Sequence, residues 1–441
     1  MNAHDFVTGL TWAELPEAVR RKVGFLLLDL LAVMVAGRPA PAARIAADYA
    51  SVAHGGDAAT SLLDGRRLSA PGAAMANGVL ANVLDNDDGH RLTKGHPGAV
   101  VIPAALAVAE AAGVSCEEFL TAVVAGYELA IRAGVRQHAR WPMYHGSGSW
   151  GAVGAAVAAA RLLRLDHDQF AHAVGLAEYH GPIALIMRTV AEPAMTKDGI
   201  GWGAMVGVSS AMLAQRGFTA TGSELLAGEP LDDLGTRWDL MDLYVKPYPC
   251  CRWAQPAIEA ARDVRGRTAL AAIDTVTIRT FAAAAELARH RPRNTEEAQY
   301  NLTWPVAAAL AHGEFDVAMA LGGFDDPATT AMLERITVAV APEFTAAFPA
   351  RRLTEVSVRL ADGRELSSGT VEAAGEPGDD RWEQVVRDKV TRVLGPCPDK
   401  LNVDPPGDIL GRTGLDRLIA ILGYSLKELS AHEALGPASG H

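Results

Sequence analysis

The sequence predicts a mainly α-helical protein, with a large helical domain formed by both ends of the chain and a smaller α+β domain inserted between them. The spacing of apolar residues supports this prediction. It is helical from about residue 15 to residue 240, alternates as in β-strands after residue 273, and is helical again from residue 382. We therefore expect the helical domain to comprise residues 1–245 and 381–441, and the α+β domain residues 246–380.

The helical part is predicted from segments that have almost no polar face. Residues 101–112, 119–135 and 151–165 are rich in Ala, Val and Leu on all sides, so we expect them inside a helical assembly rather than at its surface. Near the end of the chain, residues 382–394 and 414–429 return to helical spacing.

The α+β part is predicted from alternating runs that contain many β-branched residues. Ile273–Thr280 alternates as a half-buried strand does. Residues 354–360 and 364–371 flank an Asp-Gly pair, which predicts a β-hairpin. Residues 296–312 and 327–338 between these strands have helical spacing, and the Gly- and Pro-containing residues 375–380 are predicted to be a linker.

Composition and charge exclude several classes of protein. With 441 residues, 49% of them hydrophobic, the chain can bury a sizeable core, which argues against disorder. A net charge of −12 with no Lys/Arg-rich run argues against nucleic acid as a partner. The longest apolar run, residues 24–37, contains Asp29 and is too short for a membrane helix. Four cysteines are too few for a disulfide framework, and no leader is evident, so we expect a cytoplasmic protein.

The densest polar cluster holds carboxylates, imidazoles and cations in one glycine-containing loop: Asp85, Asp87, Asp88, His90, Arg91, Lys94 and His96. Groups packed in this way shift each other's pKa values, as acid–base sites require. A solvated loop with one aspartate capping a helix is an alternative. A metal site is another, although the spacing matches no zinc or calcium signature.

Three further segments carry candidate functional residues. His145 and Ser147 precede an apolar helix, whose free N–H groups could face an anion. Lys197 leads into another such helix and either reaches solvent or binds an anionic partner. Lys246, Tyr248 and Arg252 lie in a proline-stiffened stretch at the predicted domain junction, where ligand sites are frequent. The adjacent cysteines at 250 and 251 lack a redox-motif spacing, so packing is the favoured interpretation.

Cationic side chains gather in these segments although the chain as a whole is acidic: His90, Arg91, Lys94, His96, His145, Lys197, Lys246 and Arg252. This distribution predicts a site for a small polyanion such as a di- or tricarboxylate. The histidines and Asp85 are then available for proton transfer next to a carboxylate. No dinucleotide fingerprint follows a strand and no phosphate-binding loop of the Walker type is present, so we expect no nucleotide cofactor.

These segments, in this order, resemble the MmgE/PrpD family over nearly the whole chain. The motifs that carry the resemblance are Asp85-x-Asp87-Asp88, Gly95-His96-Pro97, Met195-Thr196-Lys197, Lys246-Pro247-Tyr248-Pro249, and Ala298-Gln299-Tyr300 before Val306-Ala307-Ala308. The resemblance implies a helical domain with an α+β lid, a homodimer, and no metal or organic cofactor. It also implies that the catalytic residues are Asp85, His96, His145, Lys197 and Lys246.

We further expect substrate contacts from His90, Arg91, Ser147, Tyr248, Arg252, Gln299 and Trp304. The sequence departs from the family pattern at Gly89, where many members have Thr or Ser, at Cys251, where the decarboxylases have His, and at Trp304, where Tyr is common. These departures make cis-aconitate decarboxylation less favoured.

The family resemblance places dehydration first among the possible reactions and an epimerase or isomerase second. A metal-dependent enzyme that uses the carboxylates of residues 85–88 and His90, and a binding protein without catalysis, remain alternatives to test.

Overall fold

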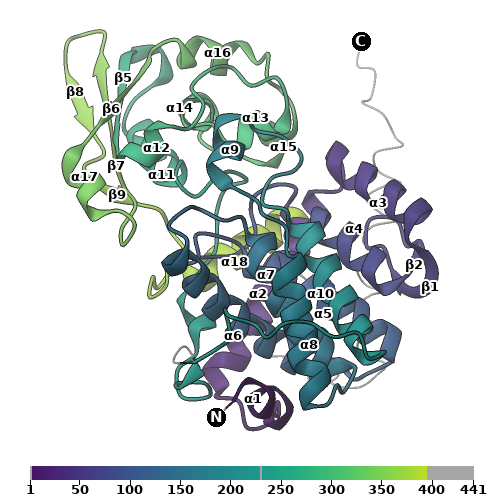
Figure 1. Cartoon of the computed structure of the whole chain (residues 1–441). Helices are drawn as coiled ribbons and strands as arrows, with labels where there is room; N and C mark the ends of the chain where they lie inside the picture. Colours follow the sequence, from purple (N-terminus) through teal and green to yellow (C-terminus); the bar gives the residue numbers. More distant parts are fainter. Residues whose placement is uncertain (1, 229–230, 395–441) are drawn as a thin grey trace.

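The computed structural model describes residues 2–228 and 231–394 (Figure 1). Within these ranges it contains eighteen α-helices and nine short strands, so the prediction of a mainly α-helical protein is confirmed. The predicted helical segment at residues 414–429 lies outside the described residues, as does Cys397.

The helical part occupies the lower right of Figure 1 and is built around α7. This helix packs against α5, α6 and α10, and α18 near the described C-terminal end packs on α2. The bounds are α1 Ala3–Gly9, α2 Glu17–Ala36, α3 Pro41–Ala53, α4 Ala70–Asn82, α5 Pro97–Ala112, α6 Cys116–Arg140, α7 Ser147–Leu162, α8 His167–His180, α10 Ile200–Gln215 and α18 Trp382–Leu394. The short helix α9, Ile186–Ala191, belongs to the same stretch of sequence but is drawn in the upper part of Figure 1, where its Val190 packs with the second hydrophobic cluster.

The three segments without a polar face form the interior of this part, as predicted. Nearly every residue of α5 and α7 is buried, as is the middle of α6. Small residues allow these helices to approach closely. A Cβ at Gly154 of α7 would collide with Ala130 of α6, and a Cβ at Gly203 of α10 would collide with the backbone of Gly148.

The second part, at the upper left of Figure 1, holds a five-stranded sheet in the order β6-β5-β7-β8, with β9 paired to β7. The strands β5 and β6 run parallel, whereas β7 is antiparallel to β5, β8 and β9. The bounds are α11 Gln255–Arg267, β5 Ile273–Thr280, α12 Ala282–Ala285, α13 Thr295–Gln299, α14 Thr303–His312, α15 Val317–Leu321, α16 Pro327–Leu333, β6 Ile336–Val340, α17 Pro342–Ala347, β7 Leu353–Leu360, β8 Glu365–Ser367 and β9 Val371–Glu372.

Two predictions in this part are confirmed and one is wrong. The strand Ile273–Thr280 is β5, and the Asp-Gly hairpin joins β7 to β8 with Gly363 at φ +87°. Residues 327–338 were predicted to be helical throughout, but α16 ends at Leu333 and β6 begins at Ile336. The β-branched residues of Ile336–Val340 favour a strand, and pairing with β5 satisfies their backbone groups.

The prediction of an entirely helical domain is also wrong in detail. Two small two-stranded sheets interrupt the helices: β1 (Gly55–Thr60) with β2 (Arg67–Leu68), and β3 (Gly89–His90) with β4 (Leu243–Tyr244). The second of these sheets joins the polar loop at residues 85–98 to the proline-rich stretch that begins at Lys246. Backbone pairing thus brings together two motifs that are far apart in the sequence.

The buried hydrophobic side chains form two main clusters. One uses residues between 3 and 245 together with residues 374–390, and the other uses Val190 and residues between 248 and 360. The clusters adjoin near residues 243–252, where the cationic motifs also lie. The predicted domain limits, residues 1–245 with 381–441 for one domain and residues 246–380 for the other, stay a prediction.

No single described helix combines the length and the hydropathy of a membrane span. Helices α2 and α3 reach these limits only as a pair, and they are bent by 94° relative to each other.

Candidate active site

A small cavity of about 60 Å³ lies where the two hydrophobic clusters meet. The helical part contributes Asp85, His96 and Asp198 to its wall. The segment that leads to the sheet, and the sheet part itself, contribute a set of cationic and aromatic residues: Tyr244, Lys246, Arg252, Trp253, Tyr300, Phe348 and Arg352. The cavity is therefore bordered by charged groups from at least four separate stretches of sequence.

The turn after α4 places Asp85 in this cavity. The N–H of Asp85 donates to the carbonyl of Asn82 at 2.9 Å, and its φ of +50° lies in the left-handed region that Asp tolerates better than most residues. Lys246 Nζ donates to Asp85 Oδ1 at 2.6 Å and to the Asp85 carbonyl at 2.8 Å. Burial alone would raise the pKa of Asp85, but Lys246 and His96 outweigh it and hold this pKa well below its usual range.

His96, at the start of α5, is surrounded by carboxylates. Its Nδ1 lies 2.7 Å from the carbonyl oxygen of Asp88, and because a carbonyl only accepts, Nδ1 carries a proton. Its Nε2 lies 3.3 Å from Asp85 Oδ1 and 3.6 Å from Asp198 Oδ2, while Asp87 Oδ2 lies 3.3 Å from Nδ1. Burial and Lys246 would lower the pKa of His96, but Asp87 and Asp85 outweigh both and raise it to about 9. His96 is thus positively charged at neutral pH.

Lys197 is buried near Asp85 and Lys246. Its Nζ donates to the Asn82 carbonyl and to Gln299 Oε1, both at 2.6 Å. Gln299 is itself held by bonds from Nε2 to the Val83 carbonyl and to Thr295. Burial lowers the pKa of Lys197, although Asp85 and other carboxylates partly oppose this shift. Gln299 thus holds Lys197 in place, and its predicted contact with substrate stays a prediction.

Asp198 is an active-site candidate that the sequence prediction missed. Ser147 Oγ accepts from the N–H of His96 at 2.8 Å and donates to Asp198 Oδ2 at 3.2 Å. Within the described ranges, Oδ1 of Asp198 has no hydrogen-bond partner. Burial raises the pKa of Asp198, and the negative charge of Asp85 adds to this shift, although His96 and the two lysines oppose it. Its place directly after Lys197 was the available signal.

Two arginines and a tyrosine form a second charged group in the cavity wall. The guanidinium groups of Arg252 and Arg352 lie 4.9 and 5.0 Å from the ring centre of Tyr244. Both arginines also bind Glu376 Oε1, at 2.8 and 3.2 Å. Arg91 reaches the same carboxylate at 3.9 Å. The predicted contact residues Arg91 and Arg252 therefore do line the cavity, whereas no sequence signal pointed to Arg352.

Among the described residues, four of the predicted site residues make no hydrogen bond or ion pair with Asp85, His96, Lys197 or Lys246. His90 is buried and receives a bond from the Thr93 N–H to its Nδ1 at 3.4 Å; burial and Arg91 lower its pKa to about 3. Tyr248 accepts from Arg262 at 2.8 Å. His145 packs beside His138, and Trp304 packs beside Phe324. In the described part of the chain, the ring nitrogens of His145 and Trp304 have no hydrogen-bond partner. Their functional roles stay predictions.

One set of residues has the spacing that a metal ion needs. Single ligand atoms of Asp85, Asp87 and His96 lie within 4.8 Å of one another. However, Lys246 already neutralises Asp85, and the raised pKa of His96 keeps its imidazole protonated rather than free to bind a metal. The charges of these residues therefore favour protonated His96, paired with the aspartates, over a bound metal ion.

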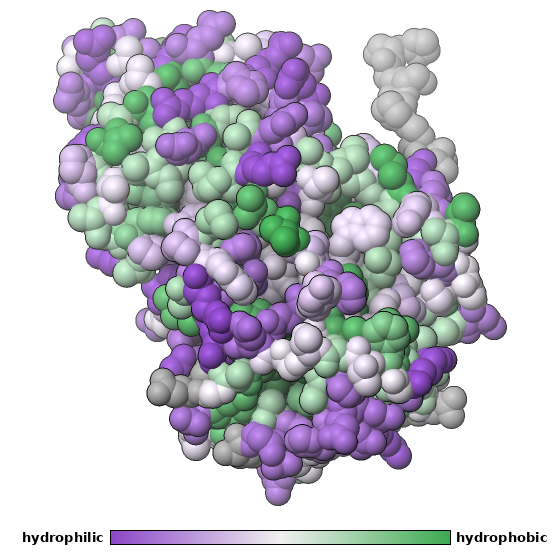
Figure 2. Space-filling model, in the orientation of Figure 1, coloured by the Kyte–Doolittle hydropathy of each residue, from purple (hydrophilic) through white to green (hydrophobic). Residues whose placement is uncertain are grey.

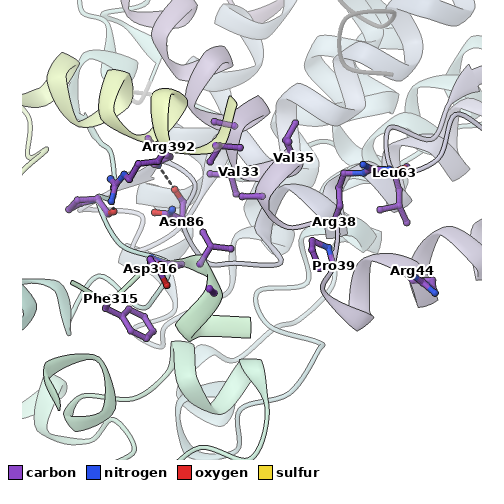
Figure 3. Close-up of a pocket in the computed structure, with 18 of the residues that line it drawn as sticks. Val33, Val35, Arg38, Pro39, Arg44, Leu63, Asn86, Phe315, Asp316 and Arg392 are labelled. Carbon is purple, nitrogen blue, oxygen red and sulfur yellow. Dashed lines mark hydrogen bonds between the residues drawn. The ribbon is translucent and has the colours of Figure 1, made fainter. Parts of the chain in front are cut away.

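A larger cavity of about 740 Å³ has Asn86, the residue after Asp85, in its wall (Figure 3). Lys389 of α18 donates to the Asn86 carbonyl at 2.6 Å. Lys389 also pairs with buried Asp29 at 2.6 Å. Arg66 in the wall pairs with Asp48 and Asp64. Because these cations are paired and no described wall residue is a histidine, we place the chemistry in the smaller cavity.

The fold and this site define a protein with a helical core, an adjoining α+β part, and buried acid–base groups between them. The MmgE/PrpD N-terminal domain matches residues 3–231 and the MmgE/PrpD C-terminal domain matches residues 248–402. The chain therefore belongs to the MmgE/PrpD family, as the motifs predicted.

Two named relatives are distant in sequence. A cis-aconitate decarboxylase-like protein (oryM) of Aspergillus oryzae is 24% identical over 70% of this chain and 73% of its own length. A cis-aconitate decarboxylase of Aspergillus terreus is 23% identical over 59% of this chain and 59% of its own length.

Proposed function

We propose that this protein is a lyase that needs no cofactor and removes a proton next to a carboxylate of a small di- or tricarboxylate. The observation that carries this proposal is the arrangement of charge. Among the described residues, the cavity wall holds six cationic side chains, those of Arg91, Lys94, His96, Lys246, Arg252 and Arg352. The carboxylates of Asp85, Asp198 and Glu376, which binds the arginines, neutralise only part of this positive charge. A dianion or trianion completes this balance. The relatives named for cis-aconitate, a tricarboxylate, support the same class.

The reaction we favour is dehydration, with Asp198 as base and His96 as acid. Asp198 Oδ1 is unpartnered among the described residues, and its raised pKa makes it a stronger base than an ordinary aspartate. It takes the proton from the carbon next to the carboxylate. Protonated His96 donates from Nε2 to the leaving hydroxyl group, so that water departs and a C=C bond forms. Lys246 and Lys197 stabilise the negative charge that develops on the substrate carboxylate.

Two other reactions use the same first step. An epimerase needs a second base, and His145, whose pKa is lowered by burial so that it stays neutral, has unpartnered ring nitrogens. Decarboxylation is favoured by the names of the relatives and disfavoured by Cys251. Burial raises the pKa of the Cys251 thiol to about 12, so this side chain cannot replace the charge of a protonated histidine.

The size of the cavity supports a role of the α+β part as a lid. A space of about 60 Å³ holds only a few water molecules and is too small for a tricarboxylate. Substrate entry therefore requires the wall that carries Trp253, Phe348 and Arg352 to move away from Asp85 and His96.

A homodimer is the assembly that we propose. Apolar side chains are exposed on and around α8, α9 and α10, among them Tyr179 (75% exposed), Ile183 (82%), Trp202 (45%) and Phe218 (53%). Figure 2 shows hydrophobic patches on the face that these helices present. A second copy of the chain would cover such a surface.

Proton NMR in D2O tests the proposed reaction. The purified protein is incubated with citrate, 2-methylcitrate, cis-aconitate and iminodisuccinate, and the Asp198→Asn variant is the matched control. We expect deuterium next to a carboxylate with the unmodified protein and none with the variant. The product distinguishes dehydration, decarboxylation and epimerisation. No exchange in any compound would contradict the proposal for this group of substrates.

A further inference from the structure

We propose that Arg352 and Arg91 form a subsite for a second carboxylate of the substrate, in the same cavity as Asp85 and His96. This inference rests on the proposed function and deepens it, because it makes the protein selective for diacids over monoacids. Both arginines line the cavity, and in the described part of the chain neither forms a hydrogen bond or ion pair with Asp85 or His96.

The first argument is a local excess of positive charge. Three guanidinium groups, those of Arg91, Arg252 and Arg352, surround the single carboxylate of Glu376 at 3.9, 2.8 and 3.2 Å. The side chains of Arg252 and Arg352 are only 3% and 4% exposed. Buried cations that lack a counter-charge are costly, so an anion from outside the chain stabilises this arrangement.

The second argument is the number of free donors. Arg252 is nearly saturated, because its guanidinium donates to Glu376, to Gln255 and to the carbonyls of residues 245, 373 and 374. Within the described ranges, the guanidinium of Arg352 makes one hydrogen bond, from Nη1 to Glu376. Its buried Nε has no partner within residues 2–228 and 231–394. Arg352 therefore keeps donors for a ligand, whereas Arg252 serves to hold Glu376 in place.

The third argument is that the two arginines come from different parts of the fold. Arg91 follows β3, and its Nη1 donates to the carbonyl of Ala350, two residues before Arg352. Arg352 directly precedes β7 and is held against the ring of Tyr244. A carboxylate bound by both would join the helical part to the α+β part. The planar fork of a guanidinium suits a carboxylate, as the bond to Glu376 already illustrates.

The test compares pairs of acids that differ only in one carboxylate. Isothermal titration calorimetry measures Kd for glutarate against pentanoate and for succinate against butyrate, without any need for turnover. We expect the unmodified protein to bind at least one diacid about tenfold more tightly than its monoacid partner, the size expected for one charged hydrogen-bonding contact. Equal Kd values for both pairs would overturn the proposal.

The variants assign this selectivity to the subsite. We expect Arg352→Met to reduce the diacid preference to about twofold and to leave the monoacid Kd unchanged. Arg359→Met is the matched control, because Arg359 lies on β7, is exposed and, among the described residues, pairs with Asp274 outside the cavity. It should keep the full preference. Equal weakening of diacid and monoacid binding by Arg352→Met would indicate a general effect on the cavity and would overturn the subsite.

A second variant, Arg91→Met, keeps the proposal testable if Arg352→Met does not fold. Arg91 is about one-third exposed, so Arg91→Met should fold even if Arg352→Met does not, and it should also reduce the diacid preference. An unchanged preference in Arg91→Met contradicts the shared subsite. Turnover is measured separately: diacid selectivity without deuterium exchange would count against the proposed reaction alone, and exchange without selectivity would count against the subsite alone.

Discussion

Nζ of Lys246 lies 2.6 Å from Oδ1 of Asp85 and 2.8 Å from the carbonyl oxygen of the same residue. The lysine side chain is 1% exposed and the aspartate side chain 3%. Burial would lower the pKa of Lys246, but Asp85 outweighs it and raises this pKa above its usual range. The two groups therefore stay ionised together, and each depends on the other.

Removal of one partner of this pair should be far more harmful than removal of both. We expect Lys246→Met to lower the free energy of unfolding by up to about 3–5 kcal/mol, because it removes the nearest cation from a buried carboxylate and leaves His96, at 3.3 Å, as its ion-pair partner. The double variant Asp85→Asn/Lys246→Met should be more stable than Lys246→Met alone. Urea unfolding measures both values. A double variant that is less stable than the single one would show that the pair contributes net stability beyond charge compensation.

The charge of His96 should make stability depend on pH. Its folded-state pKa of about 9 exceeds the ordinary histidine pKa of 6.5, so the stability that this charge contributes is fully present below pH 6.5 and is lost as the pH rises through 9. Relative to His96→Gln, the native protein should lose about 3 kcal/mol of stability across this range. Urea unfolding at pH 6, 7.5 and 9 measures the difference. A constant difference at all three values would show that His96 is not charged in the folded state.

Asp198 should show opposite effects on stability and activity. Because burial raises its pKa, the ionised form costs stability at pH values above its ordinary titration range. We expect Asp198→Asn at pH 8 to keep or slightly increase the free energy of unfolding, by about 0–1 kcal/mol. The same variant should reduce proton exchange by about 100-fold or more. Strong destabilisation with intact exchange would exclude Asp198 as the base.

The contact between Gly89 and Tyr244 should forbid any side chain at residue 89. A Cβ there would collide with the hydroxyl end of the Tyr244 ring, which Arg252 and Arg352 hold in place. We expect Gly89→Ala to cost about 1–3 kcal/mol of stability. The same substitution in a Tyr244→Ala background should cost much less, as thermal unfolding of the four proteins would measure. Equal costs in both backgrounds would exclude this collision as the reason for the glycine.

Much of the fold could be predicted because its signals are local. The helices α5, α6 and α7, the strand β5 and the Asp-Gly hairpin follow directly from apolar spacing and turn chemistry. The end of α16 could not be predicted. Residues 336–340 fit a helix or a strand by spacing, and the choice came from β5, whose free edge lies more than fifty residues earlier in the chain.

In the candidate site, too, some residues could be predicted from local signals and others could not. Charged residues in glycine- and proline-marked loops, together with the family resemblance, predicted Asp85, His96, His145, Lys197 and Lys246 as catalytic. The structure places Lys246 and His96 within 3.3 Å of Asp85, and Lys197 near enough to help lower the Asp85 pKa. His145 packs beside His138 instead, and its role stays a prediction. Asp198 and Arg352 were missed. In its own segment each of them is an ordinary charged residue. The contacts that place them in the candidate site come from residues distant in the sequence: Ser147 binds Asp198, and Glu376 binds Arg352.

By itself the sequence determined the family, the helical character and the four polar segments that hold the site, because local spacing and residue type carry this information. Only the tertiary structure decided which histidine is charged, which carboxylate keeps a free oxygen, and which arginine retains donors for a ligand. The reason is physical. Burial and short-range electrostatics set the state of an ionisable group, and both depend on what the folded chain places around it.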